Sequence, residues 1–213
     1  MEISKFGHIM ILSHEKVIFL PKEKILLLAD VHLGKVSHFR KEGIGIPQDT
    51  YKQDFRSLND VIIRFSPKHI VIMGDLFHST YNREWDDFIE FISVFENLQF
   101  TLVKGNHDIL QKNRYLATNF KVVEELLLDK MIITHEPLDI VPDEMFNIYG
   151  HIHPAVRIRG RSKQSLRLPC FMFYHNRAIM PAFGRFTGLA TQKPTVENDI
   201  YVISDNSVIH LST

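Results

Sequence analysis

The sequence predicts an α/β protein built as a four-layer αββα sandwich, in which two mixed β-sheets pack face to face between flanking helices. Three observations predict this class. Up to about residue 110, apolar runs of strand length alternate with amphipathic helical segments. After residue 120 the apolar runs continue with little helix between them, which indicates a second, more antiparallel sheet. Five runs end in Asp, Asn or His, and open α/β sheets place their sites at the carboxyl ends of strands.

The length and composition predict a single domain. The chain has 213 residues, of which 45% are apolar, and it shows no internal repeat or linker, so we expect one domain over residues 1–213. Acidic and basic residues balance at 25 each, so net charge neither favours nor excludes a nucleic-acid partner. No acidic residue occurs between Glu144 and Glu197, which makes the C-terminal third locally basic.

The sequence also favours a cytoplasmic location. A lone cysteine, Cys170, cannot form an internal disulfide and fits a reducing compartment as a core residue. The N-terminal residues lack the long apolar core of a signal peptide, and no apolar run reaches spanning length. We therefore expect no membrane partner, whereas the oligomeric state stays open.

The elements of the first half follow from the spacing of apolar residues. Strand-length runs cover 8–12, 16–20, 26–29, 70–73 and 100–103, the first two forming a β-hairpin. A helix begins at Pro47 and stops at Ser66-Pro67, and a second begins at the N-cap Asn82. Residues 33–46 contain three glycines without a clean period, which predicts a loop beside the site. The expected strands of the second half are 121–128, 131–134, 146–149, 168–174 and 200–203.

The polar residues that end five of these runs form a candidate metal centre. They supply carboxylate, amide and imidazole groups without sulfur, a set that suits Mn, Fe or Zn: Asp30, His32, Asp75, Asn106, His135, His151 and His153. Seven ligands suit two divalent ions that share one carboxylate, and Asp75 is the best candidate because it has no partner ligand two residues away. Gly74, Gly105 and Gly150 precede ligands, which suits tight turns with positive φ close to the ions.

Two metal ions side by side predict phosphoester hydrolysis, because together they activate a water and clamp a phosphoryl group. His107 then fits the acid that protonates the leaving oxygen, with Asp108 orienting its ring. Basic and imidazole side chains near the expected centre are candidate substrate contacts: Lys35, His38, Arg40, His78, Arg157, Arg159 and Arg161. His78 could equally be an ordinary surface residue. Arg157, Arg159 and Arg161 could equally lie on a solvent-exposed strand face.

These residues match the signature of the calcineurin-like metallophosphoesterase superfamily, which the chain resembles across residues 30–153. The segments Asp30-Val31-His32-Leu33-Gly34-Lys35 and Gly74-Asp75-Leu76-Phe77-His78 resemble the forms found in DNA-repair nucleases. Further segments, Phe39-Arg40-Lys41-Glu42-Gly43-Ile44, Gly150-His151-Ile152-His153-Pro154 and Pro181 to Gly188, resemble the bacterial ligase-associated DNA damage response endonucleases.

The resemblance implies a four-layer sandwich and a dimetal centre that is usually active with manganese. It assigns Asp30, His32 and His153 to one ion and Asn106, His135 and His151 to the other, with Asp75 shared. It implies genomic association with an ATP-dependent DNA ligase, a helicase and an exonuclease, which are candidate partners. Single-stranded or nicked DNA is the candidate substrate of such an endonuclease.

Two other functions stay open at this point. A phosphatase or small-molecule phosphodiesterase would use the same dimetal centre, although the basic C-terminal third favours a polyanionic substrate. A non-enzymatic interaction module is the third alternative, and the presence of the complete ligand set together with His107 argues against it.

Overall fold

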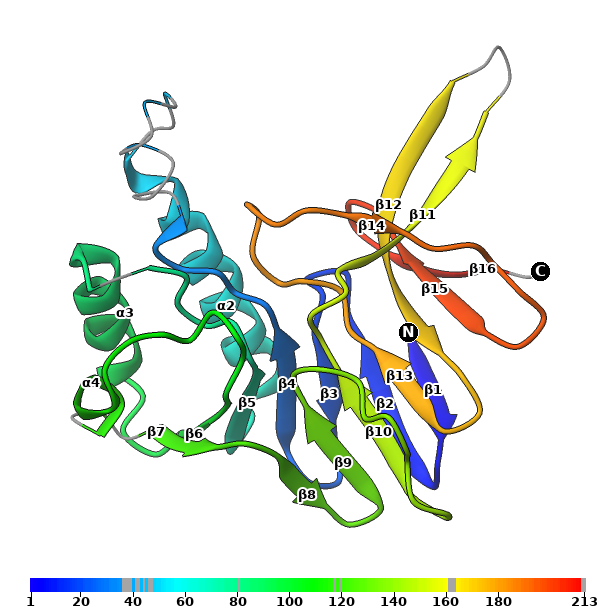
Figure 1. The fold of residues 1–213 in the computed structure, drawn as a ribbon, viewed down its shortest axis with the longest axis horizontal. Helices are drawn as coiled ribbons and strands as arrows, with labels where there is room; N and C mark the ends of the chain where they lie inside the picture. Colours follow the sequence, from blue (N-terminus) through cyan, green and yellow to red (C-terminus); the bar gives the residue numbers. More distant parts are fainter. Residues whose placement is uncertain are drawn as a thin grey trace.

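The computed structural model describes residues 1–35, 40, 43, 45, 48–79, 81–116, 118, 120–160 and 164–211. Within these residues the chain forms two mixed β-sheets with few helices (Figure 1). None of the helices in this part of the chain is long and apolar enough to cross a membrane.

The first sheet has seven strands in sequence order. They are β1 (Glu2–Lys5), β2 (His8–Leu12), β3 (Ile18–Leu20), β4 (Ile25–Ala29), β5 (His69–Met73), β6 (Gln99–Val103) and β7 (Phe120–Val123). The pairs from β1 to β4 are antiparallel, and those from β4 to β7 are parallel. The carboxyl ends of β4, β5 and β6 therefore meet at one edge of this sheet.

The second sheet has nine strands and mixed pairing. They are β8 (Leu126–Leu128), β9 (Met131–Thr134), β10 (Phe146–Tyr149), β11 (Pro154–Arg159), β12 (Ser165–Phe173), β13 (Arg177–Ile179), β14 (Ala190–Thr191), β15 (Asp199–Ile203) and β16 (Val208–Leu211). Their order is β14-β11-β12-β13-β10-β9-β8, and β15 joins β12 to β16. Strand β10 is parallel to both neighbours, β9 and β13, whereas β11 and β12 form an antiparallel hairpin.

Side-chain alternation along the parallel strands builds two cores. On β4, Leu26 and Leu28 point to the side covered by helices, whereas Leu27 and Ala29 point to the second sheet. A strand buried on both faces needs a continuous apolar run, which explains the sequence Ile25-Leu26-Leu27-Leu28-Ala29. Each large side chain that is fully buried contributes about 1.5–3 kcal/mol, so these two cores hold both faces of the sheet.

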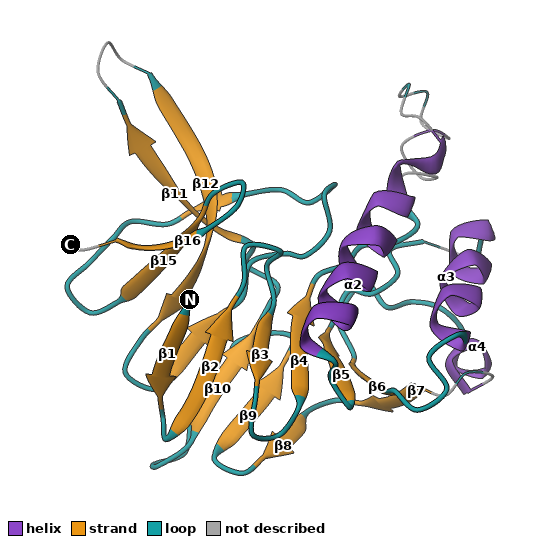
Figure 2. Ribbon diagram, turned by 180° about the vertical axis from the view of Figure 1, so that it is seen from behind, coloured by secondary structure: helices purple, strands orange, loops and turns teal. Residues whose placement is uncertain are grey.

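The helices cover the outer face of the first sheet. They are the 3₁₀ helix η1 (Gln48–Tyr51), α2 (Lys52–Phe65), α3 (Arg83–Ser93) and the short α4 (Lys112–Leu116), and Figure 2 shows α2 and α3 together on one side. Helix α2 buries Leu58, Val61 and Ile62 against this face. It ends at Ser66, whose left-handed backbone (φ +45°) lets its N–H donate to the Ile62 carbonyl. Asn82 caps α3 by accepting from the Glu84 N–H at 2.8 Å, as predicted.

Several boundaries differ from the sequence-based expectations. The expected strand 121–128 is two strands in different sheets, because the exposed pair Glu124-Glu125 interrupts it between β7 and β8. Strand β1 was not predicted. Pro47 and most of the expected loop 33–46 lie outside the described residues, and Lys35 and Arg40 within that stretch are helical. Among the described residues, helices cover the first sheet only. The outer face of the second sheet carries a small apolar cluster from β10, β11, β12, β13 and β15.

Candidate metal centre

The seven predicted metal ligands converge where strands of the two sheets end. Asp30, Asp75 and Asn106 follow β4, β5 and β6 of the first sheet. From the second sheet, His135 follows β9, whereas His151 and His153 lie between β10 and β11. Because the sheets pack face to face, these ends supply ligands from opposite sides.

Most of the ligands have a strained backbone. Asp30, His32, Asp75, His151 and His153 all have φ between +50° and +64°. This left-handed region costs a residue with a side chain of the order of 1–3 kcal/mol, and such residues cluster at functional sites. Backbone hydrogen bonds hold the strained turns, since the Asp30 N–H donates to the Gly74 carbonyl at 3.2 Å and the His32 N–H to the Asp75 carbonyl at 2.8 Å.

The glycines that precede ligands are required mainly by close packing. Only Gly74 has the positive φ (+73°) that we predicted for all three. A Cβ atom on Gly74 would lie 2.0 Å from Nδ1 of His135, and one on Gly105 would lie 2.4 Å from Oδ1 of Asp75. On Gly150 it would lie 2.5 Å from Oδ2 of Asp30. Any side chain at these positions would therefore displace a metal ligand.

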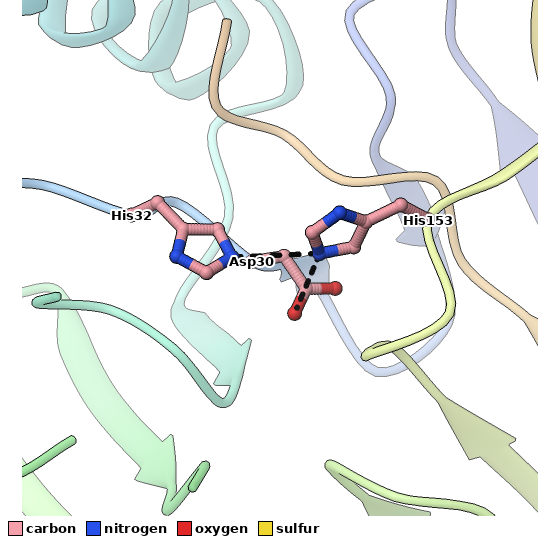
Figure 3. A group of neighbouring side chains, drawn as sticks. All are labelled: Asp30, His32 and His153. Carbon is pink, nitrogen blue, oxygen red and sulfur yellow. Dashed lines mark hydrogen bonds and ion pairs between the residues drawn. The ribbon is translucent and has the colours of Figure 1, made fainter. Parts of the chain in front are cut away.

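The first group of candidate ligands contains Asp30, His32 and His153, whose ligand atoms all lie within 4.8 Å of one another (Figure 3). Nε2 of His153 is 3.4 Å from both Nε2 of His32 and Oδ1 of Asp30. Burial, followed by the charge of Lys35, lowers the pKa of His32 to about 2, so its ring is neutral.

Asp30 provides the test of whether a cation fits this group. Its Oδ2 accepts a hydrogen bond from the His151 N–H at 2.9 Å. Its Oδ1 is buried and has no hydrogen-bond partner among the described residues. An orphan carboxylate oxygen is costly to bury, and this one faces imidazole nitrogens. A divalent cation between them would satisfy all three side chains.

The second group surrounds His135. Its Nδ1 lies 3.1 Å from the Met73 carbonyl, and because a carbonyl only accepts, Nδ1 donates and Nε2 is left to bind a metal. Nε2 is 2.9 Å from Oδ1 of Asn106 and 3.2 Å from Nδ1 of His151. The ligand atoms of Asp30, Asp75 and His135 also all lie within 4.8 Å of one another. Ligand atoms of several residues thus surround Nε2 of His135 and form a second candidate metal site.

Asp75 lies between the two groups. Its Oδ1 is 3.4 Å from Nε2 of His135, and its Oδ2 is 3.6 Å from Nε2 of His32. Asp30 belongs to both groups, but its Oδ1 alone faces the imidazoles of His153 and His135, at 3.4 and 3.8 Å, while its Oδ2 accepts from the His151 N–H. Asp75 therefore has the better geometry for a shared carboxylate, with one oxygen facing each group.

His107 and His78 form a pair beside the first group. The ring centroids of the two imidazoles lie 3.9 Å apart and the rings are stacked at 27°. Nδ1 of His78 is 3.1 Å from Nδ1 of His32, which fits a residue that orients a metal ligand. The His107 N–H donates to Oδ1 of Asp75 at 2.9 Å, so its backbone is fixed to the centre while its half-buried ring lies beside the ligands.

The carboxylate of Asp108, which we predicted to orient the ring of His107, contacts two backbone N–H groups. Its Oδ1 accepts from the Phe77 N–H at 3.1 Å, and its Oδ2 accepts from the Gly105 N–H at 2.8 Å. Both oxygens therefore hold the backbone of the loops after β5 and β6. Burial raises the pKa of Asp108 to about 6 against these hydrogen bonds.

The candidate substrate contacts lie in different places. Lys35 is partly buried near Asp75 and Asp30, where burial lowers its pKa and the two carboxylates oppose that shift. Arg40, Arg157 and Arg159 are exposed, the last two on β11. His38 and Arg161 lie outside the described residues.

Residues 182–185 support the metal centre by binding the backbone at the end of β4. The Phe183 N–H donates to the Ala29 carbonyl at 2.8 Å and the Gly184 N–H to the Asp30 carbonyl at 3.1 Å. A Cβ on Gly184 would lie 2.2 Å from the Val31 carbonyl oxygen. Spacing alone gave no sign of this support, and only the motif from Pro181 to Gly188 marked the segment. Nε of Arg185 lies 3.6 Å from Oδ1 of the buried Asp54. This ion pair connects residues 182–185 to helix α2.

Asp54 gives a prediction about pH. Burial raises its pKa to about 6, above the ordinary value of 3.8, although Arg185 and Lys16 oppose the shift. A raised carboxyl pKa contributes stability that is present below pH 4 and is lost as pH rises through 6. We expect Asp54→Asn to flatten the pH dependence of the unfolding free energy between about pH 4 and 6, measured by urea denaturation. Asp60→Asn, an exposed site on the same helix, is the control, and identical pH profiles for Asp54→Asn and wild type would contradict the assignment.

Comparison with known proteins defines the class of this chain. The sequence profile of the calcineurin-like phosphoesterases matches residues 23–168, more than half of the chain and every candidate metal ligand. The chain thus belongs to the calcineurin-like phosphoesterase family, a family of metal-dependent phosphoesterases.

Solved structures give more particular similarities. The Pseudomonas putida nuclease MPE is 26% identical, with a TM-score of 0.81 and 99% of each chain covered. The chain is also similar to YfcE, a phosphoesterase from E. coli, at 14% identity and a TM-score of 0.46, with 87% of this chain and 96% of that chain covered. Comparison with curated proteins gave no match.

Proposed function

We propose that this protein is a dimetal phosphodiesterase that cleaves DNA as an endonuclease. The observation that carries the proposal is the pair of neighbouring ligand groups, which share Asp30 and have Asp75 between them. Oδ1 of Asp30 is buried and has no hydrogen-bond partner among the described residues. The similarity over the full length to a nuclease supports DNA as the substrate. A DNA-repair role, with an ATP-dependent DNA ligase, a helicase and an exonuclease as partners, stays a prediction from family resemblance.

The proposed ligand assignment follows the two groups. Asp30, His32 and His153 would hold one ion, and the remaining ligands, Asn106, His135 and His151, would hold the other, with Asp75 shared. The oxygen and nitrogen donor set suits Mn, with Fe or Zn as alternatives. When bound, the two ions would supply an activated water and neutralise charge on the phosphate.

The protein's own side chains would divide the remaining work. His107 would give a proton to the leaving oxygen, because its ring is half-buried beside the ligands and its backbone is fixed to Asp75. His78 would hold His32 through its Nδ1 and stack on His107, thereby coupling the metal centre to the acid. Asp108 would keep both loops in place through backbone N–H groups.

The test compares three substrates after Mn is added to metal-stripped protein. We expect bis-p-nitrophenyl phosphate, a diester, to be hydrolysed faster than the monoester p-nitrophenyl phosphate. We also expect circular single-stranded DNA to be cut, which only an endonuclease can do. Faster hydrolysis of the monoester with uncut circles would overturn the proposal and favour a phosphatase. Fe and Zn in parallel samples would identify the most active metal.

The cytoplasmic location and the single domain over residues 1–213 remain predictions. Cys170 is fully buried, and burial raises the pKa of its thiol to about 12, which fits a core residue without redox chemistry.

A further inference from the structure

The hairpin of β11 and β12 begins at the metal centre and projects away from it. Strand β11 starts at Pro154, directly after the candidate ligand His153. Figure 1 shows the hairpin extending beyond the rest of the second sheet. Side chains on β11 are therefore connected to the centre by one continuous strand, and those on β12 are held beside them by antiparallel pairing.

One face of this hairpin carries three arginines. Arg157 and Arg159 are two residues apart on β11 and so share a face. Arg157 lies directly opposite Arg167 of β12 in the antiparallel register, which adds Arg167 to the same face. We call Arg157, Arg159 and Arg167 the arginine face. Like charges directly opposite each other destabilise a strand pair, so this pairing is unfavourable unless an anion binds there.

No acidic side chain neutralises the arginine face within the part of the chain that the structure describes. Arg157, Arg159 and Arg167 are all exposed and none forms an ion pair there. The sequence itself has no Asp or Glu from residue 145 to residue 196. The positive charge of the arginine face is therefore available to bind an anionic partner.

Distance along β11 restricts what that partner can be. At about 3.3 Å per residue, the backbone of Arg157 lies about 10 Å along β11 from that of Pro154, the residue after His153, and Arg159 lies about 17 Å along it. A small phosphate ester bound at the metal centre is too short to contact both positions. Only an anion that continues beyond the cleaved bond can reach them.

The opposite side of the centre has the reverse charge. A groove there is lined by Asn106 and His135 together with three exposed acids, Glu124, Glu125 and Glu136. These acids repel a polyanion, even though Lys104 also lines the groove. The charge pattern around the site thus favours a strand that leaves the centre along the hairpin.

We propose that the arginine face binds the backbone of a single-stranded nucleic acid at phosphates beyond the one that is cleaved. This inference rests on the proposed function and adds to it a direction for the strand and a contact, Arg167, that sequence spacing did not indicate. The face contributes to the use of a polymeric substrate and leaves hydrolysis of a small diester unaffected.

The experiment replaces Arg157, Arg159 and Arg167 together by Gln in the full chain loaded with Mn. The kcat/KM for a single-stranded oligonucleotide is measured from low to moderate salt, beside bis-p-nitrophenyl phosphate in the same buffers. Each lost phosphate contact should reduce the slope of log kcat/KM against log salt by about 0.7, and three contacts by about 2. The kcat/KM for the small diester should stay within about twofold, because that substrate does not reach the hairpin.

A matched control separates local contacts from general charge. Lys22, Lys68 and Lys130 are exposed at the amino ends of β4, β5 and β9, on the edge opposite the metal centre. Replacing these three by Gln changes the net charge equally and should leave the DNA salt slope close to that of the wild type.

The outcomes distinguish this inference from the proposed function. If the wild type cuts the oligonucleotide and both triple variants have its salt slope, the arginine face is not a contact surface. An equal reduction of the slope in both variants leads to the same conclusion. In either case the nuclease proposal stands. If the wild type hydrolyses the small diester but neither binds nor cuts the oligonucleotide, both proposals are overturned. A flattened slope in the arginine variant alone supports the inference.

Discussion

Asp75→Asn is expected to abolish phosphodiester hydrolysis and to lower the occupancy of both metal ions in one step. The two carboxylate oxygens face different ligand groups, and a neutral amide bridges two cations poorly. Residues that only support metal ligands contribute 10–100-fold to affinity, so losing a shared ligand should cost more than about 10²-fold. Elemental analysis after gel filtration measures the occupancy.

The control for this prediction is Asp60→Asn, which removes the same charge from the exposed side of α2. It should retain wild-type metal content and activity. If Asp75→Asn retains two ions per chain, the shared ligand is a different residue, and Asp30, which belongs to both candidate groups, is the next to test.

His107→Ala is expected to separate metal binding from proton transfer. The link from residue 107 to Asp75 is made by the backbone N–H, so truncating the side chain should leave both ions bound. Loss of a general acid should lower kcat for substrates with poor leaving groups by about 10²–10⁴-fold. The loss should be much smaller with bis-p-nitrophenyl phosphate, because p-nitrophenolate leaves without a proton.

The measurement is kcat for a DNA strand and for bis-p-nitrophenyl phosphate in the same preparation, together with its metal content. Equal deficits on the two substrates would show that His107 does not act as the acid. Loss of metal would instead place the ring of His107 among the residues that hold the centre.

The sequence predicted the parts of the site that are local in the chain. An apolar run that ends in Asp30 or in Asp75 marks both a buried parallel strand and its carboxyl end. Parallel pairing then brings such ends together without further information. The hairpin 8–12 with 16–20 and the N-cap at Asn82 were predictable for the same reason, since neighbouring residues determine both.

Features that depend on pairing between distant segments were not predictable. The arginine face requires the register that places Arg167 opposite Arg157, and sequence spacing does not give a register across a hairpin whose turn is unknown. The contacts of Asp108 were not predictable either, because one of the two backbone N–H groups from which it accepts belongs to Phe77, in a distant loop. The split between β7 and β8 depends on which sheet each half joins.

Titration of metal-stripped protein with Mn, followed by both calorimetry and hydrolysis of bis-p-nitrophenyl phosphate, tests the dimetal centre most directly. The geometry around Asp75 predicts two ions per chain and activity that rises mainly with the second. Binding of a single ion, or full activity when only one is bound, would contradict a dimetal phosphodiesterase.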